Sequence, residues 1–322
     1  MAKYVAKRIG LMFVSFFIIM TICFVLVRLL PNPNVAVVGG MDKQVEAMRE
    51  AWGYNKPIIV QYGIYLKKVL TEFNWGITTS LAPKYTSVVS IIAQKLPATL
   101  LVNLLSIVVS IPLGILFGIY AALKKNKWQD QVISVLIMLL ISVPSYVYAF
   151  LVQYIFAFKL GWFPLVLKSG TDWLSPEMIH SAILPAMSLS FGTMAGLMRY
   201  TRAELTETLT SEYMLLARTK GLTGAQATTR HALRNAMVPI LPMILGEIVC
   251  ILGGSLVIES IFAVPGVGKL YTLSISVRDY DMFLAIAMFY VFIGLSASIL
   301  TDISYGFIDP RIRMGGGKNN ER

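Results

Sequence analysis

The sequence predicts an all-α membrane protein that crosses the bilayer six times. Of its 322 residues, 56% are hydrophobic and 14% are charged, whereas soluble domains carry about 25% charged residues. Five stretches of at least 18 residues contain no charged side chain. About 20 apolar residues cross a bilayer as a helix, and lipid offers a backbone no hydrogen bonds. These repeated stretches therefore favour membrane helices over the core of a soluble domain.

The six spans are expected at the apolar runs, in the order 9–30, 98–123, 131–158, 181–198, 236–258 and 282–301. The first run follows Lys3, Lys7 and Arg8, as the core of a secretory signal would. It is longer than a typical signal core and ends without a small-x-small cleavage pattern. We therefore interpret it as an uncleaved first span.

Some residues inside the spans carry structural signals. Prolines remove a backbone hydrogen bond and favour kinks; they are Pro112, Pro144, Pro185, Pro239 and Pro242. Gly114 and Gly118 have the spacing that lets two helices approach closely. Cys23 and Cys250 fall in apolar runs, which indicates small buried hydrophobes rather than a disulfide framework.

Basic residues mark one side of the membrane. They gather after the second span, after the fourth span and in the tail, as Lys124, Lys125, Lys127, Arg199, Arg202, Arg218, Lys220, Arg230, Arg234, Arg311, Arg313, Lys318 and Arg322. The short loops on the other side are nearly neutral. Because cytoplasmic loops are rich in Lys and Arg, both termini are predicted to be cytoplasmic. This asymmetry accounts for most of the net charge of +11, so a nucleic-acid partner is not expected.

The spans divide the chain into four parts. These are an N-terminal span (1–30), an extracytoplasmic loop (31–97), a core (98–306) with a cytoplasmic loop at 199–235, and a cytoplasmic tail (307–322). Within the extracytoplasmic loop, 41–52 is rich in helix formers and 52–75 is rich in aromatic residues. We expect this loop to form a small helical cap over the bundle.

The loop at 199–235 has the pattern of a helix, a turn and a second helix. Apolar residues recur at helical spacing, which predicts one apolar face formed by Leu205, Leu209, Tyr213 and Leu216. Arg218 and Lys220 suit the last turn of a helix, and Gly221 suits the left-handed position that ends it. Thr223 and Gln226 form a capping box. An exposed apolar ridge needs a partner, which is the bundle itself, the lipid surface or a cytoplasmic protein.

Three motifs carry a family resemblance. Ala-Arg-Thr-Lys-Gly-Leu at 217–222, followed by Arg-His-Ala-Leu-Arg-Asn-Ala-Met-Val-Pro at 230–239, resembles the cytoplasmic signature loop of binding-protein-dependent ABC permeases, especially the oligopeptide, dipeptide and nickel group. The segment 259–269 with 278–280, and Leu-Pro-Ala-Met at 184–187 upstream of two arginines, are similar to the same group. The resemblance covers almost the whole chain.

The chain departs from the family pattern at two places. The family's general loop pattern is Glu-Ala-Ala, three residues and Gly, whereas Leu215, Leu216, Ala217 and Gly221 stand at the matching positions here. The peptide group commonly has Ala-Arg-x-Lys-Gly, so this departure favours the peptide branch. Pro-Asn-Pro-Asn at 31–34 stands where relatives often have Pro-Gly-Asp-Pro.

The resemblance implies an importer subunit in the cell membrane. It implies transport of oligopeptides or dipeptides, with nickel or another small solute of the group as the alternative. Expected partners are a second homologous permease subunit, two cytoplasmic ABC ATPase subunits and an extracytoplasmic solute-binding protein, within membrane lipid. ATP and Mg would bind the ATPase subunits, and no cofactor or catalytic residue is expected on this chain. The implied ATPase-coupling residues are Glu212, Tyr213, Leu216, Ala217, Arg218, Lys220, Gly221, His231, Arg234 and Asn235.

Two polar residues inside the spans are candidates for the solute pathway. Glu247 is the one clear charge deep in a predicted span, and such groups are functional candidates. It could line the pathway and meet a peptide amine, or pair with a backbone group or the partner permease. Asn103 in the second span has the same two interpretations.

Other motifs in the chain resemble parts of known binding or catalytic sites but do not complete one. Pro-Gly-Val-Gly-Lys at 265–269 resembles part of a nucleotide-binding loop, but Ala263 and Leu270 stand where that loop needs Gly and Ser or Thr. His180 and His231 lie on opposite predicted sides, so no metal site is expected. A secondary transporter would need coupling-ion groups and inverted repeats, and a membrane enzyme would need a convergent polar cluster; the sequence has neither pattern.

Overall fold

The computed structural model describes residues 2–30, 50–81, 83 and 85–308. Helices dominate this part of the chain, which contains no strand and a single antiparallel bridge between Ile77 and Ser87. Residues 41–49 of the predicted helical stretch 41–52 lie outside the described residues. Residues 309–322 of the predicted tail lie outside them as well. The all-α class predicted from the sequence is confirmed.

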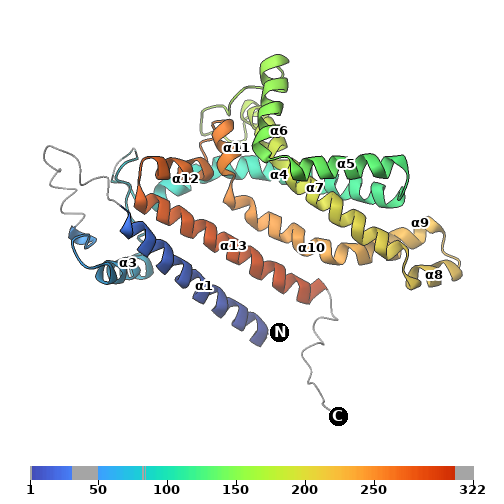
Figure 1. Cartoon of the computed structure of the whole chain (residues 1–322), viewed down its shortest axis with the longest axis horizontal. Coiled ribbons are helices and arrows are strands. Elements are labelled where there is room, and N and C mark those ends of the chain that lie inside the picture. Colours follow the sequence, from blue (N-terminus) through green and yellow to red (C-terminus); the bar gives the residue numbers. More distant parts are fainter. Residues whose placement is uncertain (1, 31–49, 82, 84, 309–322) are drawn as a thin grey trace, which may run out of the picture.

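Five long helices form the body of the molecule (Figure 1). They are α1 (Ala2–Leu29), α4 (Val88–Leu123), α7 (Pro176–Leu209), α10 (Leu233–Cys250) and α13 (Tyr280–Ile308). In space, α1 contacts α13, α13 contacts α10, α10 contacts α7, and α7 contacts α4. Among the described residues, five helical stretches are long and apolar enough to cross a membrane, or six if one bent pair counts as a span.

Most helices extend beyond the predicted spans. The second helix begins at Val88 rather than 98, so that Pro97 lies inside it. The fourth runs from Pro176 to Leu209 rather than over 181–198. The apolar pattern finds only the part of a helix that lies in hydrocarbon, whereas the backbone can continue its hydrogen bonds into polar surroundings.

The third predicted span is bent rather than continuous. It consists of α5 (Trp128–Ser142), α6 (Ser145–Val152) and a π-helical segment (Gln153–Lys159), with a bend of 104° between the two halves. Val143 is extended because the ring of Pro144 disfavours a helical conformation at the preceding residue. Figure 1 shows α6 projecting away from the body of the bundle, where it contacts α11 (Leu256–Ile261) and α7.

Gly114 and Gly118 lie where α4 meets α7. A Cβ at Gly114 would stand 2.8 Å from the Leu197 Cβ, and one at Gly118 would stand 2.6 Å from the Thr201 Cβ. Only residues without side chains allow the two backbones to come this close. The close approach predicted from the glycine spacing is therefore present, within one chain.

The bundle has two distinct ends (Figure 1). We call the end with α3 (Ile58–Glu72) and α12 (Val267–Ser276) the cap end, and the end with α8 (Glu212–Thr219) and α9 (Gly224–Ala227) the loop end. The start of α1 and the end of α13 both point toward the loop end, where Arg8 and Asp302 form an ion pair of 2.9 Å. Both ends of the described chain thus lie on the same side as the 199–235 loop.

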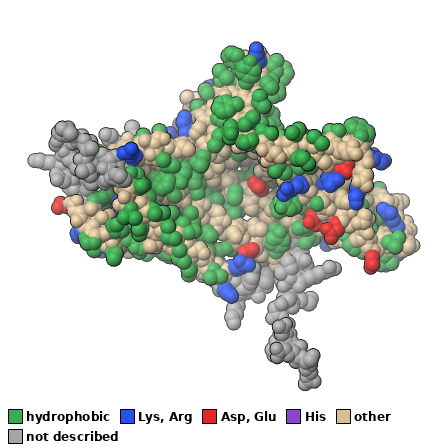
Figure 2. All heavy atoms as spheres, in the orientation of Figure 1, with side chains coloured by type: hydrophobic (Ala, Val, Ile, Leu, Met, Phe, Trp, Pro, Cys, Tyr) green, Lys and Arg blue, Asp and Glu red, His purple; other side chains and the backbone are tan. Residues whose placement is uncertain are grey.

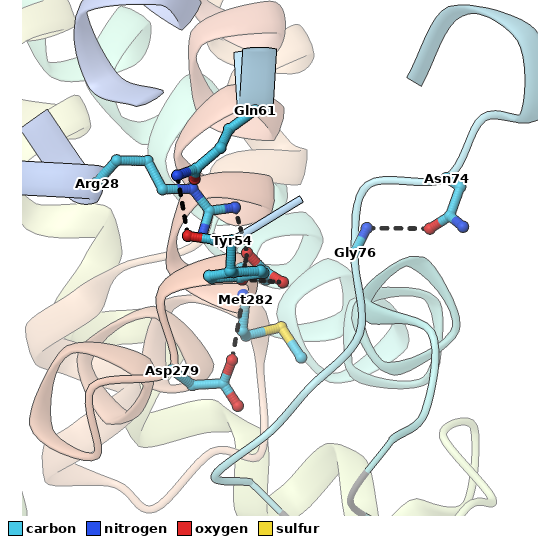
Figure 3. A network of polar contacts seen from close by, with 8 residues as sticks. Arg28, Tyr54, Gln61, Asn74, Gly76, Asp279 and Met282 are labelled. Carbon is cyan, nitrogen blue, oxygen red and sulfur yellow. Dashed lines mark hydrogen bonds and ion pairs between the residues drawn. The ribbon is translucent and has the colours of Figure 1, made fainter. Parts of the chain in front are cut away.

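At the cap end, a buried ion pair joins the first and last long helices (Figure 3). The Nη2 atom of Arg28 lies 3.5 Å from the Oδ1 atom of Asp281, and both side chains are less than 10% exposed. The hydroxyl of Tyr54 donates to the same carboxylate at 3.1 Å. Burial raises the pKa of the Tyr54 hydroxyl well above its usual value, so this group remains a hydrogen-bond donor. The segment before α3 is thereby attached to α1 and α13.

A second buried carboxylate at the cap end holds a loop. The Oδ2 atom of Asp279 accepts hydrogen bonds from the Thr78 hydroxyl at 2.7 Å and from the backbone N–H groups of residues 79, 80 and 81. Its other oxygen accepts from the N–H of Met282 in the first turn of α13 (Figure 3). One fully buried side chain therefore connects residues separated by about 200 positions in the sequence.

Candidate functional site

The loop end carries the predicted helix, turn and second helix. Helix α7 ends at Leu209, and α8 follows after Thr210 and Ser211. Gly221 has a φ of 85°, the left-handed value that glycine adopts without steric cost. Thr223 and Gln226 then form the predicted capping box, with both reciprocal hydrogen bonds present. The chain returns to the bundle through a π-helical segment (Thr228–Ala232) into α10.

The single apolar face predicted for this loop is wrong. Leu205 and Leu209 belong to α7, whereas Tyr213 and Leu216 belong to α8, and the break at 210–211 turns the two pairs apart. On α8, Met214 and Ala217 are the buried residues, and they pack with Leu205, Ala122 and Ala236 from three long helices. Ala217 therefore anchors α8 to the bundle and is not accessible to a partner.

The opposite side of α8 is exposed and apolar. Tyr213 is 39% exposed, Leu215 66% and Leu216 55%. Glu212, Arg218, Lys220 and Gly221 are also exposed and surround these three residues. We call this set the α8 face: residues Glu212, Tyr213, Leu215, Leu216, Arg218, Lys220 and Gly221. Large exposed apolar side chains rimmed by charges are typical of a surface that binds another protein.

The other implied coupling residues lie close to α8 along the chain. His231, Arg234 and Asn235 are exposed, on the π-helical segment and the first turn of α10. Figure 2 shows that Lys and Arg side chains gather over the loop end together with Asp and Glu side chains, while hydrophobic side chains cover much of the rest of this face. The loop end thus combines an apolar helix face with charged surroundings.

Glu247, the charge found deep in the fifth span, borders a cavity between α7 and α10. The cavity measures about 260 Å³ and is lined by Gly192, Thr193, Gly196, Leu197, Met243 and Glu247. Thr193 donates its hydroxyl hydrogen to the Glu247 carboxyl at 3.4 Å. Asn103 differs, because its amide donates to the Thr99 carbonyl within its own helix at 2.9 Å. Of the two pathway candidates, Glu247 is the one beside an open space.

The glycine-rich segment at 265–269 encloses a carboxylate of the chain itself. Glu259 is 2% exposed and accepts hydrogen bonds from the Lys269 N–H at 2.9 Å and the Thr99 hydroxyl at 2.9 Å. A Cβ on Gly266 would collide with the Glu259 carboxylate and the Thr99 hydroxyl. The N-terminus of α12 does hold an anion, as a nucleotide-binding loop would. Here the anion is Glu259, which belongs to the same fold.

No group of three or more His, Cys, Asp or Glu residues is positioned to bind a metal ion within 2–30, 50–81, 83 and 85–308. His180 stacks on the ring of Phe163 at 4.9 Å, beside a cavity at the start of α7. His231 lies at the loop end. The structure does not bring these two histidines together.

Sequence reasoning missed several residues that the structure brings together. Leu215 is the most exposed apolar residue of the α8 face, but the pattern assigned it no role. Glu259 and Asp279 are buried by partners far away in the sequence, Thr99 and Thr78. In the sequence, Glu259 is marked only by the glycines that precede and follow it, and Asp279 only by its place at the start of a helix.

Comparison with known proteins agrees with this arrangement. Residues 114–314 match the family described as the inner membrane component of binding-protein-dependent transport systems. Residues 1–103 match the N-terminal family of such membrane components. Apart from residues 104–113 of α4, the two matches together cover the membrane helices described above.

Similar proteins cover nearly the full chain. The dipeptide transport system permease protein DppB of Lactococcus lactis subsp. cremoris is 35% identical over 314 residues, covering 98% of this chain and 100% of that protein. The protein of the same name in Bacillus subtilis is 35% identical over 315 residues, covering 98% and 99%. A putative peptide permease protein of Brucella ovis is 35% identical over 301 residues, covering 90% and 92%. These relatives are permeases rather than enzymes, and the chain belongs to the family of inner membrane components of binding-protein-dependent transport systems.

Proposed function

We propose that this chain is one of two permease subunits of an ATP-driven importer of short peptides. A binding protein delivers the peptide at the cap end, and ATPase subunits act at the loop end. The α8 face is the observation that carries the proposal. A short helix with three exposed apolar side chains, anchored to the bundle by Met214 and Ala217, is suited to transmit force from a partner to several membrane helices.

The coupling follows from how α8 is attached. Ala217 belongs to one buried cluster with Leu205 of α7, Ala122 of α4 and Ala236 of α10. A partner that binds the outer side of α8 and changes shape on binding ATP would therefore act on this buried cluster, to which three long helices contribute. Such a partner shifts the inward-open and outward-open populations through its different affinity for the two states. The ATP and Mg belong to the partner in this scheme.

We infer that the loop end faces the cytoplasm. Basic residues gather over the loop end in Figure 2, as the positive-inside rule requires of a cytoplasmic side. The Arg8–Asp302 pair sets the start of α1 and the end of α13 on that side. ATP is available there, so an ATPase partner at α8 fits this orientation.

The proposed solute is a dipeptide or a short oligopeptide. Two of the similar proteins are named dipeptide permeases, and a third is named a putative peptide permease. Nickel or another small solute is the alternative that the family resemblance leaves open.

Substitutions on the α8 face test the coupling. In the assembled importer, replacing Leu215 and Leu216 by Ser should weaken binding of the ATPase subunits and lower ATP-dependent peptide uptake about tenfold or more. Each buried Leu contributes about 1.5–3 kcal/mol to such an interface. Uptake and co-purification of the ATPase are the two measurements.

Leu174 supplies the matched control, because it is 81% exposed and lies far from α8, before α7. Leu174→Ser should change neither measurement. If the Leu215/Leu216 double variant retains the ATPase and normal uptake, α8 is not the coupling surface.

A further inference from the structure

Helix α7 presents an open groove between α5 and α10. Gly192, Gly196, Arg199 and Ala203 are spaced by four, three and four residues, so they share one stripe of the helix. Nothing lies within 4 Å of the position that a Cβ would take at Gly196. On the α10 side the stripe adjoins the 260 Å³ cavity, and on the α5 side it adjoins a second cavity of about 310 Å³. We call the stripe and its two cavities the α7 groove.

The two cavities carry opposite charges. Glu247 borders the first, and Arg199 and Arg202 border the second, with Ser134 and Ser142 among its other lining residues. Arg202 is already neutralised, because its Nε and Nη2 atoms donate to the two carboxylate oxygens of Asp130. Arg199 lies near the ring of Tyr200, at 5.1 Å, and forms none of the ion pairs found in the described residues.

Glu247 is likewise without a cationic partner among the described residues. Its hydrogen bond comes from the neutral hydroxyl of Thr193. A charge at this depth is costly unless it faces water, a counter-ion or a ligand. The groove therefore holds one acidic and one basic group, neither of which has an ion-pair partner among the described residues. This arrangement suits a ligand with a positive and a negative end.

The spacing along the α7 axis is comparable with the length of a short peptide. Thr193, which contacts Glu247, and Arg199 are six positions apart on α7, which corresponds to about 9 Å along the helix axis. An extended tripeptide spans about 10 Å. At neutral pH its amino terminus is positive and its carboxyl terminus is negative.

We propose that the α7 groove binds the zwitterionic backbone of a short peptide, with its amino terminus at Glu247 and its carboxyl terminus at Arg199. The inference rests on the proposed function and adds the chemical group that is recognised and its direction. The glycines at 192 and 196 let the peptide backbone approach the helix closely. Recognition of the two termini leaves the side chains of the peptide unselected.

An anionic phospholipid is the competing ligand for this position. Its phosphate could pair with Arg199, and its chains could lie along Ile137, Met138 and Ile141. Such a lipid would leave the carboxyl of Glu247 without a cation. The presence of both an acidic and a basic group along the α7 groove therefore favours the peptide.

The test is equilibrium dialysis of radiolabelled trialanine with the complete transporter complex in nanodiscs, without the binding protein. N-acetyl-trialanine lacks the amine charge, and trialanine amide lacks the carboxylate. The intact transporter should bind each blocked peptide about tenfold more weakly than trialanine. The Glu247→Gln transporter should bind trialanine and N-acetyl-trialanine equally, but should still bind trialanine amide more weakly. The Arg199→Gln transporter should bind trialanine and trialanine amide equally, but should still bind N-acetyl-trialanine more weakly.

Three further variants make the result specific. Glu177→Gln and Arg230→Gln change charges outside the groove and should bind like the unaltered transporter. Gly196→Val should lower trialanine binding at least tenfold while the complex still assembles, because its side chain enters open space.

The inference is overturned if the intact transporter binds all three peptides with equal affinity. It is also overturned if the intact transporter binds trialanine no more tightly than the Glu247→Gln/Arg199→Gln double variant does. Loss of bound phosphatidylglycerol from Arg199→Gln, with peptide binding unchanged, assigns the site to lipid instead. In each of these cases, ATP-dependent peptide uptake by the same complex would leave the proposed function intact. Absence of ATP-dependent peptide uptake would contradict both the proposed function and the inference about the α7 groove.

Discussion

At the scale of single residues, buried carboxylates organise the cap end. Glu259 accepts hydrogen bonds at the N-terminus of α12, and Asp279 accepts them from residues 78–81. A carboxylate in low-polarity surroundings is stable only when several donors satisfy it. The glycines next to Glu259 are therefore required by its position, since any side chain there would displace the carboxylate.

Replacing Gly266 by Ala should destabilise the protein by about 1–3 kcal/mol, because the new Cβ would overpack the space held by Glu259. The thermal midpoint of the purified complex should fall by several degrees. Gly294→Ala is the control, since nothing lies within 4 Å of its Cβ position in α13. Equal midpoints for the two variants would show that the Glu259 enclosure does not contribute to stability.

The residue scale also marks where sequence reasoning ends. Glu247 could be identified as functional because a charge in a long apolar run is conspicuous without any structure. Glu259 and Asp279 could not, because their partners Thr99 and Thr78 are 160 and 201 positions away. Asn103 looked like Glu247 in the sequence, yet it bonds its own helix.

At the scale of elements, helix ends determine how α8 is presented. Gly221 and the Thr223–Gln226 capping box were predictable, since both depend on local backbone geometry. The faces of α8 were not, because the break at 210–211 changes the helical phase between Leu209 and Tyr213. The periodicity of apolar residues cannot locate a break that preserves their spacing.

Gly221→Val tests the helix stop after α8. A β-branched residue at a φ of 85° costs about 1–2 kcal/mol, so the turn should reorganise and tilt the α8 face. We expect peptide uptake to fall about tenfold while ATP hydrolysis and assembly continue. Gly224→Val introduces the same side chain three residues later, at a position without positive φ, and should retain uptake. Normal uptake by Gly221→Val would show that the turn is not needed for coupling.

The broken third span is another element-scale difference. Prolines also lie inside the unbroken α4, α7 and α10, so Pro144 alone did not predict a 104° bend. What distinguishes it is the packing of α6 on α11, together with hydrogen bonds from the Gln153 amide to the carbonyls of Leu165 and Ile261. These contacts are long-range and leave no pattern in the local sequence.

At the scale of the whole molecule, the all-α fold class follows from the lipid bilayer that surrounds the protein. Long uncharged runs must become helices in lipid, and this requirement made the all-α membrane fold predictable from composition alone. The arrangement of the helices was not predictable in the same way, because lipid does not distinguish one apolar face from another. The two ends differ chemically. The cap end contains buried, hydrogen-bonded carboxyl groups, and the loop end carries exposed apolar and basic groups.

This polarity fits an importer that receives its solute at one end and its energy at the other. Along α7, the cavity beside Glu247 is lined by residues 192–197, and the cavity beside Arg199 is lined by residues nearer the end of the helix at Leu209. A peptide moving inward would therefore pass the acidic group before the basic one.

The central claim is that this chain is an essential permease subunit for peptides. The most direct measurement is uptake of radiolabelled dialanine into membrane vesicles, with radiolabelled nickel in parallel, comparing the full transporter with one that lacks this chain. Dialanine uptake should require both ATP and this chain, and nickel uptake should be absent. Dialanine uptake that persists without the chain, or nickel uptake that depends on it while dialanine uptake does not, would contradict the account.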